Sequence, residues 1–494
     1  MSEPTVQKLS FFEKAGYSLG DGAANFVFQT MILFQLNFYT DTMGIVAAVA
    51  GSLLLVGRLW DAFFDPMMGL MADRTNTRWG KFRPWVLWTA LPWGVVMVVA
   101  YTTPNFSGAG KIVYACVTNI MLMTLYSANN TPYSAMTGVM TGDVNERTSL
   151  SSFRFVSAMI AQLMVGGFTL PLVAKFGHGD NAKGWQMTMG LWASICVVLF
   201  LITFLTTKER IQPDPKQKSD AKNDFSTLLK TGPWVAMFIL TLAHFSVLAM
   251  RGGTLSYYFQ YYVNHDKLFG LLQSVGLVNP SGHGLWSYLL NTFGLVVDPK
   301  QTNVASVGFS LFNMSSQFVT VIGVLCSTYL SMKFGKKAVA IAGFSLTTIF
   351  MALFALIPAD AVGSIFLLEY VRALSYAPTI PLIWSMYADV VDYSEWKTGR
   401  RITGVIYATI LFGLKFGLSL GGAMAGWLLS GFGYRANAVQ TAESLTGIRL
   451  TISLFPTVLF AVVILCLMTY KIGRKLNIQI QDELAERRKG FAAG

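Results

Sequence analysis

The chain has 494 residues, of which 53% are hydrophobic and 13% are charged. A soluble domain carries about 25% charged residues, so this composition excludes a soluble enzyme, a secreted disulfide scaffold and a disordered protein. On a soluble chain the net charge of +12 would favour nucleic acid as a partner. The long apolar runs instead predict an integral membrane protein that has the lipid bilayer, and no nucleic acid, as its partner.

Apolar stretches long enough to cross ~30 Å of hydrocarbon recur along the whole chain. We expect twelve membrane spans, at residues 15–40, 46–71, 84–103, 110–138, 152–175, 186–206, 231–262, 303–331, 338–357, 362–388, 401–430 and 446–471. A polar, charged segment at 207–230 separates the first six spans from the last six. This pattern predicts an all-α membrane protein with two six-helix lobes, the organisation of a two-lobed transporter.

The predicted organisation has four parts and one insert. Residues 1–206 form the first lobe, 207–230 a central cytoplasmic loop, 231–472 the second lobe and 473–494 a cytoplasmic tail. The external segment 263–302 mixes apolar periodicity with Asn, Pro, Gly and His. We expect short amphipathic helices on the outer face there. A lid over the external mouth is the alternative.

The distribution of Lys and Arg predicts the orientation. With the N-terminus inside, the inner segments hold 25 of these residues and the outer segments hold 7. Basic residues concentrate on the cytoplasmic side of membrane proteins. Both termini are therefore expected in the cytoplasm.

Two carboxylates lie within the second span. Asp61 and Asp65 are four residues apart and share a helix face, and Arg58 precedes them by one turn. Two stacked carboxylates in a medium of low dielectric cannot both stay ionised without a cation. We expect the pair to hold a coupling ion, H⁺ or Na⁺. A structural ion pair between Arg58 and one carboxylate is the alternative.

Polar side chains also gather on spans 1 and 4. Span 1 carries Asp21 and Asn25 one turn apart. Span 4 carries a cluster beside Pro132, formed by Tyr126, Ser127, Asn129, Asn130, Thr131 and Tyr133. Amides and hydroxyls both donate and accept hydrogen bonds, which suits a sugar ligand. Hydrogen bonding between helices is the alternative.

Charged and aromatic residues of later spans complete the candidate site. Lys415 lies too deep in span 11 to reach water easily, so we expect it to face a carboxylate across the lobe interface, or water. Arg154 opens span 5. Trp384 follows Pro381 on span 10 and is either a sugar platform or a packing residue.

Four other residues within spans carry no clear function at this point. Glu369 and Arg372 are expected to pair locally on span 10, and Arg251 remains unassigned. His244 is expected in the core or in a cavity wall.

Opposite charges at the inner ends of spans 2 and 10 suggest a gate between the lobes. The basic group is Arg74, Arg78, Lys81 and Arg83, and the acidic group is Asp389, Asp392 and Glu395. Exposed pairs contribute about 0–1 kcal/mol each, so only several together would hold the inner face shut. Alternatively, the basic loop only sets topology and contacts anionic lipid.

Three stretches of sequence carry a family resemblance. The stretch YTDTMG…VGRLWDAFFDPMMGLMADRTNTRWGKFRPW, with DVNERTSLSSFR and ADVVDYSEWKTGRR, resembles the glycoside–pentoside–hexuronide:cation symporters. That family belongs to the major facilitator superfamily and includes melibiose permease. The resemblance covers nearly the whole chain outside 263–302 and implies a major facilitator fold.

The resemblance assigns roles to single residues. Asp61 and Asp65 match the family's cation-site carboxylates, and Ser127 stands where melibiose permease has a cation-site threonine. Lys415 and Arg154 match the family's basic residues on spans 11 and 5.

Other positions depart from the pattern of melibiose permease. Phe64 replaces a frequent cation ligand, which favours H⁺ over Na⁺. Asn25 and Asn130 stand where melibiose permease has its two sugar-binding aspartates, and Ser134 stands where it has a tryptophan on span 4. The galactoside pocket is therefore not copied.

The expected function is the import of a sugar or glycoside, such as a pentoside, glucuronide or oligosaccharide, with H⁺ or Na⁺ by alternating access. We expect a monomeric carrier in a bacterial inner membrane, with no enzymatic activity and no cofactor. A membrane-embedded transferase, a channel and a carrier of a non-sugar solute are the competing interpretations.

Overall fold

The computed structural model describes residues 8–141, 144–210, 231–278, 280, 284–399 and 403–492, and the described part is helical with no β-strand. The helices from α1 to α6, which we call the first lobe, pack against one another through α1–α5, α1–α6, α3–α4, α3–α6 and α2–α4 contacts. Their bounds are α1 (Phe11–Asn37), continued by the π-helical turn η1 (Phe38–Thr42), α2 (Ala47–Arg74), α3 (Arg83–Ala100), α4 (Gly108–Met140), α5 (Val144–Gly177) and α6 (Asn181–Thr206).

We call the helices from α8 onward the second lobe, in which α8 packs against both α16 and α18. Its helices are α8 (Gly232–Tyr257) with the π-helical turn η2 (Tyr258–Tyr262), α9 (His265–Ser274), α10 (Leu285–Thr292), α11 (Val304–Leu325), α12 (Ser327–Phe334), α13 (Lys336–Leu353) with the short turn η3 (Phe354–Leu356), α14 (Val362–Tyr376), α15 (Thr379–Thr398), α16 (Thr403–Gly431), α17 (Ala442–Ile452), α18 (Leu454–Thr469) and the tail helix α19 (Arg474–Ala492).

Ten helical segments of the described chain are long and apolar enough to cross a membrane. They match ten of the twelve expected spans. The other two are α1, whose Glu13, Asp21 and Asn25 lower its hydropathy, and the α14–α15 segment. Both pack among the spanning helices of their own lobes. The all-helical membrane fold is confirmed, and the count of twelve stays a prediction.

Prolines interrupt two of the expected spans. Span 362–388 is two helices, because Pro378 lacks an N–H and the chain turns between α14 and α15. The expected span 446–471 is likewise split at Ser453, three residues before Pro456. Neighbouring helices and side chains satisfy the backbone groups that such breaks release.

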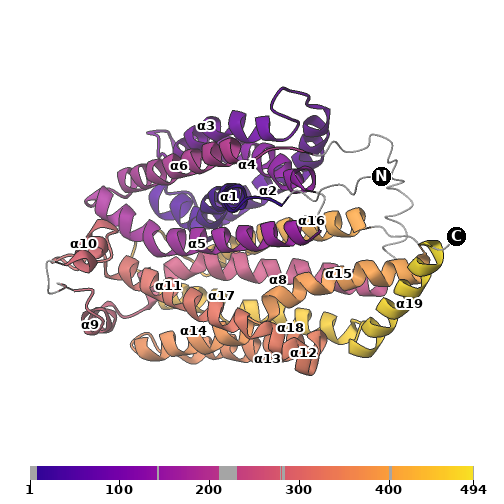
Figure 1. Cartoon of the computed structure of the whole chain (residues 1–494). Helices are drawn as coiled ribbons and strands as arrows, with labels where there is room; N and C mark the ends of the chain where they lie inside the picture. Colours follow the sequence, from indigo (N-terminus) through magenta and orange to yellow (C-terminus); the bar gives the residue numbers. More distant parts are fainter. Residues whose placement is uncertain are drawn as a thin grey trace.

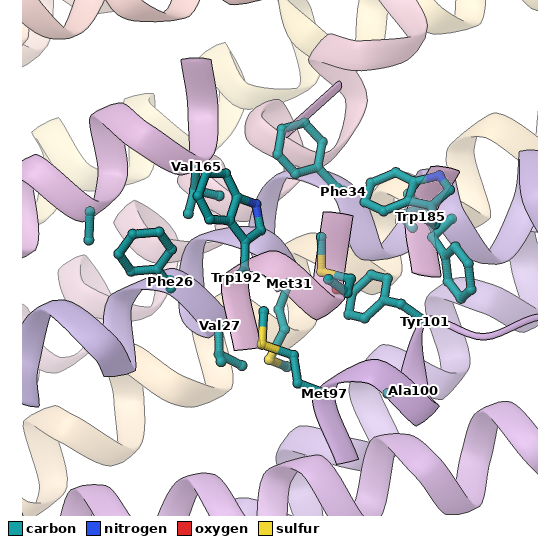
Figure 2. Close-up of a cluster of buried hydrophobic side chains, with 14 of the residues drawn as sticks. Phe26, Val27, Met31, Phe34, Met97, Ala100, Tyr101, Val165, Trp185 and Trp192 are labelled. Carbon is teal, nitrogen blue, oxygen red and sulfur yellow. The ribbon is translucent and has the colours of Figure 1, made fainter. Parts of the chain in front are cut away.

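Aromatic packing holds the first lobe together. Trp185 of α6 lies 6.0 Å from the Phe34 ring of α1, and Trp192 lies 5.1 Å from Phe26, measured between ring centroids (Figure 2). The indole N–H of Trp192 donates to Thr169 of α5 at 3.1 Å. In lipid, close van der Waals packing of this kind replaces the hydrophobic effect as the force between helices.

The two ends of the molecule differ. The tail helix α19 lies at one end, here called the terminal end, and α9 and α10 lie at the other, the loop end (Figure 1). The segment 263–302 thus contains two short helices, as expected. It belongs to the second lobe through α9, but Lys175 of α5 donates to the backbone oxygens of Asn291 and Thr292 at 2.5 and 3.1 Å. The insert therefore connects the lobes at the loop end.

The lobes meet closely where α2 crosses α16. A Cβ atom on Gly51 would lie 2.7 Å from the Ala423 carbonyl oxygen, and one on Gly426 would overlap the backbone of Ala47 and Gly51. Small residues let membrane helices approach to this distance. This crossing therefore requires glycine on both helices.

Gly426→Ala should destabilise the protein by about 1–3 kcal/mol, because the added methyl overlaps the α2 backbone. Gly431→Ala on the same helix is the control, since its Cβ would meet open space and alanine favours a helix. Thermal unfolding of the purified protein measures the difference. Equal midpoints for Gly426→Ala and Gly431→Ala would contradict the close crossing.

Candidate functional site

Lys415 links the two lobes through both carboxylates of α2. Its ammonium nitrogen lies 2.9 Å from Asp61 Oδ2 and also pairs with Asp65 Oδ2. Asp61 is fully buried. The expectation that Lys415 faces a carboxylate across the lobe interface is confirmed.

Hydroxyls of α4 complete the surroundings of the carboxylate pair. Ser127 donates to Asp61, and Thr131 donates to Asp65 at 3.3 Å. Arg58 is buried and stacks on Phe28 at 5.4 Å from the ring centroid, and no ion pair joins it to a described carboxylate. The alternative of an Arg58–aspartate pair is therefore wrong. Two carboxylates, two hydroxyls and one ammonium form what we call the α2–α16 cluster.

A second ionic group joins α1, α4 and α5. Arg154 pairs with Asp21 at 3.0 Å and lies over the Tyr133 ring at 5.2 Å. Tyr133 is stacked on Tyr17, with centroids 4.6 Å apart. The Tyr133 hydroxyl donates to the Tyr17 carbonyl oxygen at 2.6 Å. Tyr133 thus supports Arg154 from within the lobe.

The amides of the sequence-predicted sugar site make their bonds within the first lobe. Asn25 donates to the Asp21 carbonyl oxygen at 2.9 Å, and Asn130 donates to the Tyr126 hydroxyl at 3.4 Å. Asn129 is fully buried and donates to Thr89 at 2.8 Å. In this conformation these contacts stabilise α1 and α4, so a role in sugar binding stays a prediction.

A cavity of about 400 Å³ lies between α1 and α5 of the first lobe and the second lobe. This volume falls within the usual range for small-molecule sites. Of the predicted substrate-binding residues, Trp384 of α15 is among those that line it. The remaining second-lobe wall comes mainly from α8, α11 and α14. The sequence had not placed α8 and α11 in the substrate site, whereas α14 lies in the expected span 362–388, and His244 of α8 lines the cavity, one of its two expected positions. The cavity therefore adds a new part to the site.

Several predicted gate residues contact their own lobes. Asp389 pairs with Lys336 at 2.8 Å, and the Arg83 guanidinium donates to the Phe204 carbonyl oxygen at 2.7 Å. The Glu209 carboxylate accepts the backbone N–H groups of residues 81–83. The guanidinium of Arg78 lies over Trp79. A gate between these groups stays a prediction for a conformation closed at the terminal end.

Asp41 forms a bridge at the loop end that the sequence did not reveal. This buried carboxylate, in the first lobe, accepts hydrogen bonds from Tyr261 and from Tyr434, the latter at 2.7 and 2.8 Å. Asn437 donates to the Asp41 backbone oxygen at 2.6 Å. All three donors belong to the second lobe. The lobes are therefore joined at the loop end, around what we call the Asp41 latch.

Comparison with known proteins identifies the family. Residues 16–295 and 285–474 match the model of a family described as MFS/sugar transport protein. The chain belongs to this MFS/sugar transport family. It is a multi-pass membrane protein of a transporter family, and the family predicted from the sequence is confirmed.

Relatives and solved structures agree with this assignment. The chain is 36% identical to the putative glycoside/cation symporter YagG of Escherichia coli (strain K12) over 471 residues, covering 94% of this chain and 93% of the relative. It is 32% identical to the isoprimeverose transporter of Lactiplantibacillus pentosus, covering 94% and 89%. The inward-open structure of the xylose transporter XylE from E. coli matches with a TM-score of 0.58 at 12% identity, over 94% of this chain and 96% of XylE. This last likeness shows the fold.

The sequence of this MFS/sugar transport protein contains partial signals for Asp41 and Arg251, two residues that the sequence-based predictions did not assign to a site. Asp41 lies inside the YTDTMG motif, but its tyrosine partners are more than 200 positions away. Arg251 stood out as a charge within an apolar span, a position that is usually functional. Its partner was hidden because Glu369 had a local explanation in Arg372.

Tyr434→Phe should open the loop end of the transporter more often, because it removes a hydroxyl that donates to the buried Asp41. Loss of a hydrogen bond to a buried carboxylate costs about 1–3 kcal/mol. A cysteine at Gln29, which lines the cavity, reports this opening through its reaction with an impermeant thiol reagent added at the loop end.

The control is Tyr288→Phe, whose exposed ring lies on α10. Faster labelling in Tyr434→Phe alone supports the latch, and labelling as slow as in Tyr288→Phe would contradict it. The four native cysteines are replaced beforehand, so that the reagent can react only with the cysteine of Gln29→Cys.

Proposed function

We propose that this protein is a secondary active symporter that imports a sugar or glycoside with a cation. Asp61 and Asp65 are proposed as the coupling site, with Ser127 as a further contact. The observation that carries the proposal is the position of Lys415 between the two carboxylates across the lobe interface. YagG is named a glycoside/cation symporter and the Lactiplantibacillus relative an isoprimeverose transporter, which supports the same class.

The charge of the α2–α16 cluster explains how an ion could control the lobes. Two carboxylates and one ammonium leave one negative charge in a medium where unpaired charge is costly. An incoming cation compensates that charge and competes with Lys415 for the same oxygens. Release of Lys415 then removes an ion pair between α2 and α16. Ion binding is thereby coupled to the movement of one lobe against the other.

We propose H⁺ as the coupling ion, with Na⁺ as the alternative. Hard cations take about six or more oxygen ligands. The cluster has two carboxylates and two hydroxyls, and Phe64 stacks on Trp60 and supplies no oxygen. A proton requires one carboxylate oxygen and no coordination shell.

The sugar is proposed to bind between the lobes, in contact with the Asp21–Arg154 pair and Trp384. Asn25 and Asn130 would form hydrogen bonds with the sugar hydroxyls once the first lobe changes conformation. We further propose a monomeric, non-enzymatic carrier in a bacterial inner membrane with both termini cytoplasmic. The terminal end then faces the cytoplasm, and the joined loop end makes this conformation inward-facing.

Asp61→Asn should abolish accumulation of a glycoside against its gradient and leave exchange of that glycoside at least partly intact. The amide removes the charge that the coupling ion compensates, but Asp65 still pairs with Lys415. Uptake and counterflow in proteoliposomes separate the two activities. Asp360→Asn, an exposed change in the turn before α14, is the control. Wild-type accumulation by Asp61→Asn would exclude this residue from coupling.

The choice of ion is tested by adding a transported glycoside to lightly buffered cells. Proton symport predicts alkalinisation of the medium that does not depend on added Na⁺. Strong stimulation of uptake by Na⁺ at constant pH would instead assign the site to sodium.

A further inference from the structure

The second-lobe wall of the cavity contains a buried cluster of charges from three helices. Arg251 of α8 donates to Glu369 of α14 at 2.6 Å, and Arg372 donates to both Glu369 oxygens at 2.6 and 2.9 Å. Ser316 of α11 donates to the same carboxylate at 2.7 Å. All four residues line the cavity. We call them the Arg251 cluster.

The Arg251 cluster carries more positive than negative charge. Two guanidinium groups share one carboxylate, and no other described acidic group lies within ion-pair distance of either arginine. Both arginine side chains are only 10–12% exposed. A charge buried at membrane depth is costly unless a partner compensates it. The cluster therefore has one positive charge that the described protein leaves uncompensated.

The hydrogen bonds show which arginine has donors to spare. Arg372 binds Glu369 through two nitrogens, whereas Arg251 binds it through Nη2 alone. The Nε of Arg251 is buried and has no hydrogen-bond partner. Glu369 already accepts four hydrogen bonds from these two arginines and Ser316. Of the two arginines, Arg251 is thus the one whose guanidinium N–H donors have fewer partners within the described protein.

Neutral polar groups surround the same cavity. Gln29 of α1 and Gln162 of α5 lie on the first-lobe wall, and Asn313 and Gln317 of α11 lie on the second. Each amide offers donors and an acceptor to ligand hydroxyls. The cavity therefore combines one excess positive charge with several groups that suit a polyhydroxylated ligand.

We propose that the Arg251 cluster is a substrate subsite that binds the carboxylate of an acidic sugar, either a uronide glycoside or a free uronic acid. Arg251 binds the carboxylate directly, because guanidinium groups match carboxylates in shape and charge. Glu369 and Arg372 hold Arg251 in place, and the amides of α1, α5 and α11 read the hydroxyls. This inference rests on the proposed sugar symport and narrows its substrate class.

Arg251→Gln is the variant that tests this subsite. It removes the excess charge but leaves Glu369 with Arg372 and Ser316, so the buried carboxylate keeps its partners. Arg251→Lys retains the charge and is the conservative variant. Arg435→Gln, at an exposed site in the turn after α16, is the control.

The assay compares matched acidic and neutral ligands on the full-length carrier in proteoliposomes. The probes are glucosides with the corresponding glucuronides, galactosides with the galacturonides, and free glucuronate and galacturonate. We expect wild type to prefer the acidic members of these pairs. The preference should fall about tenfold or more in Arg251→Gln, return in part in Arg251→Lys and persist in Arg435→Gln. Comparison of the transport of the free acids with that of the acidic glycosides then shows whether the site binds a free uronic acid or a uronide glycoside.

Two results would overturn the inference. One is cation-dependent transport of neutral glycosides at least as good as that of their acidic partners, which leaves the sugar-symport proposal intact. The other is an acidic preference that Arg251→Gln does not change, which assigns the selectivity elsewhere. Failure to carry any neutral or acidic glycoside would instead contradict the proposed function itself.

Discussion

A charge inside a membrane protein needs a partner, and the ion pairs of Lys415 with Asp61 and Asp65 satisfy that need across the lobe interface. The two carboxylates lie on α2 of the first lobe and the ammonium on α16 of the second. Any ion that takes the place of the ammonium also removes a link between the lobes. Ion binding at these carboxylates would thereby be connected to the position of one lobe relative to the other.

The same constraint shapes the other charged groups within the helices. Asp21 and Arg154 compensate each other, and Asp41 has hydroxyl donors from the opposite lobe in place of a cation. The Arg251 cluster lies on the cavity wall with one positive charge left over. The links between the lobes include the ionic α2–α16 cluster and the Asp41 latch, whose donors are uncharged.

Sequence alone predicted what local composition determines. Apolar length gave the spans, and the spacing of Asp61 and Asp65 gave the cation candidates. The depth of Lys415 implied a partner without naming it. The latch and the Arg251 cluster escaped because their partners are distant in sequence, 393 positions for Asp41 and Tyr434. The break between α14 and α15 escaped because a membrane helix often tolerates proline, so Pro378 alone did not predict it.

The direct test of the account is the affinity of the coupling ion in wild type and in Lys415→Met without sugar. Carboxylate bands in infrared spectra report ion binding at Asp61 and Asp65. If the ion replaces Lys415, removal of this competitor should strengthen ion binding by about tenfold or more. If Lys415 instead holds the two carboxylates in position for the ion, binding should be weaker or unchanged in Lys415→Met, and the exchange mechanism would be wrong.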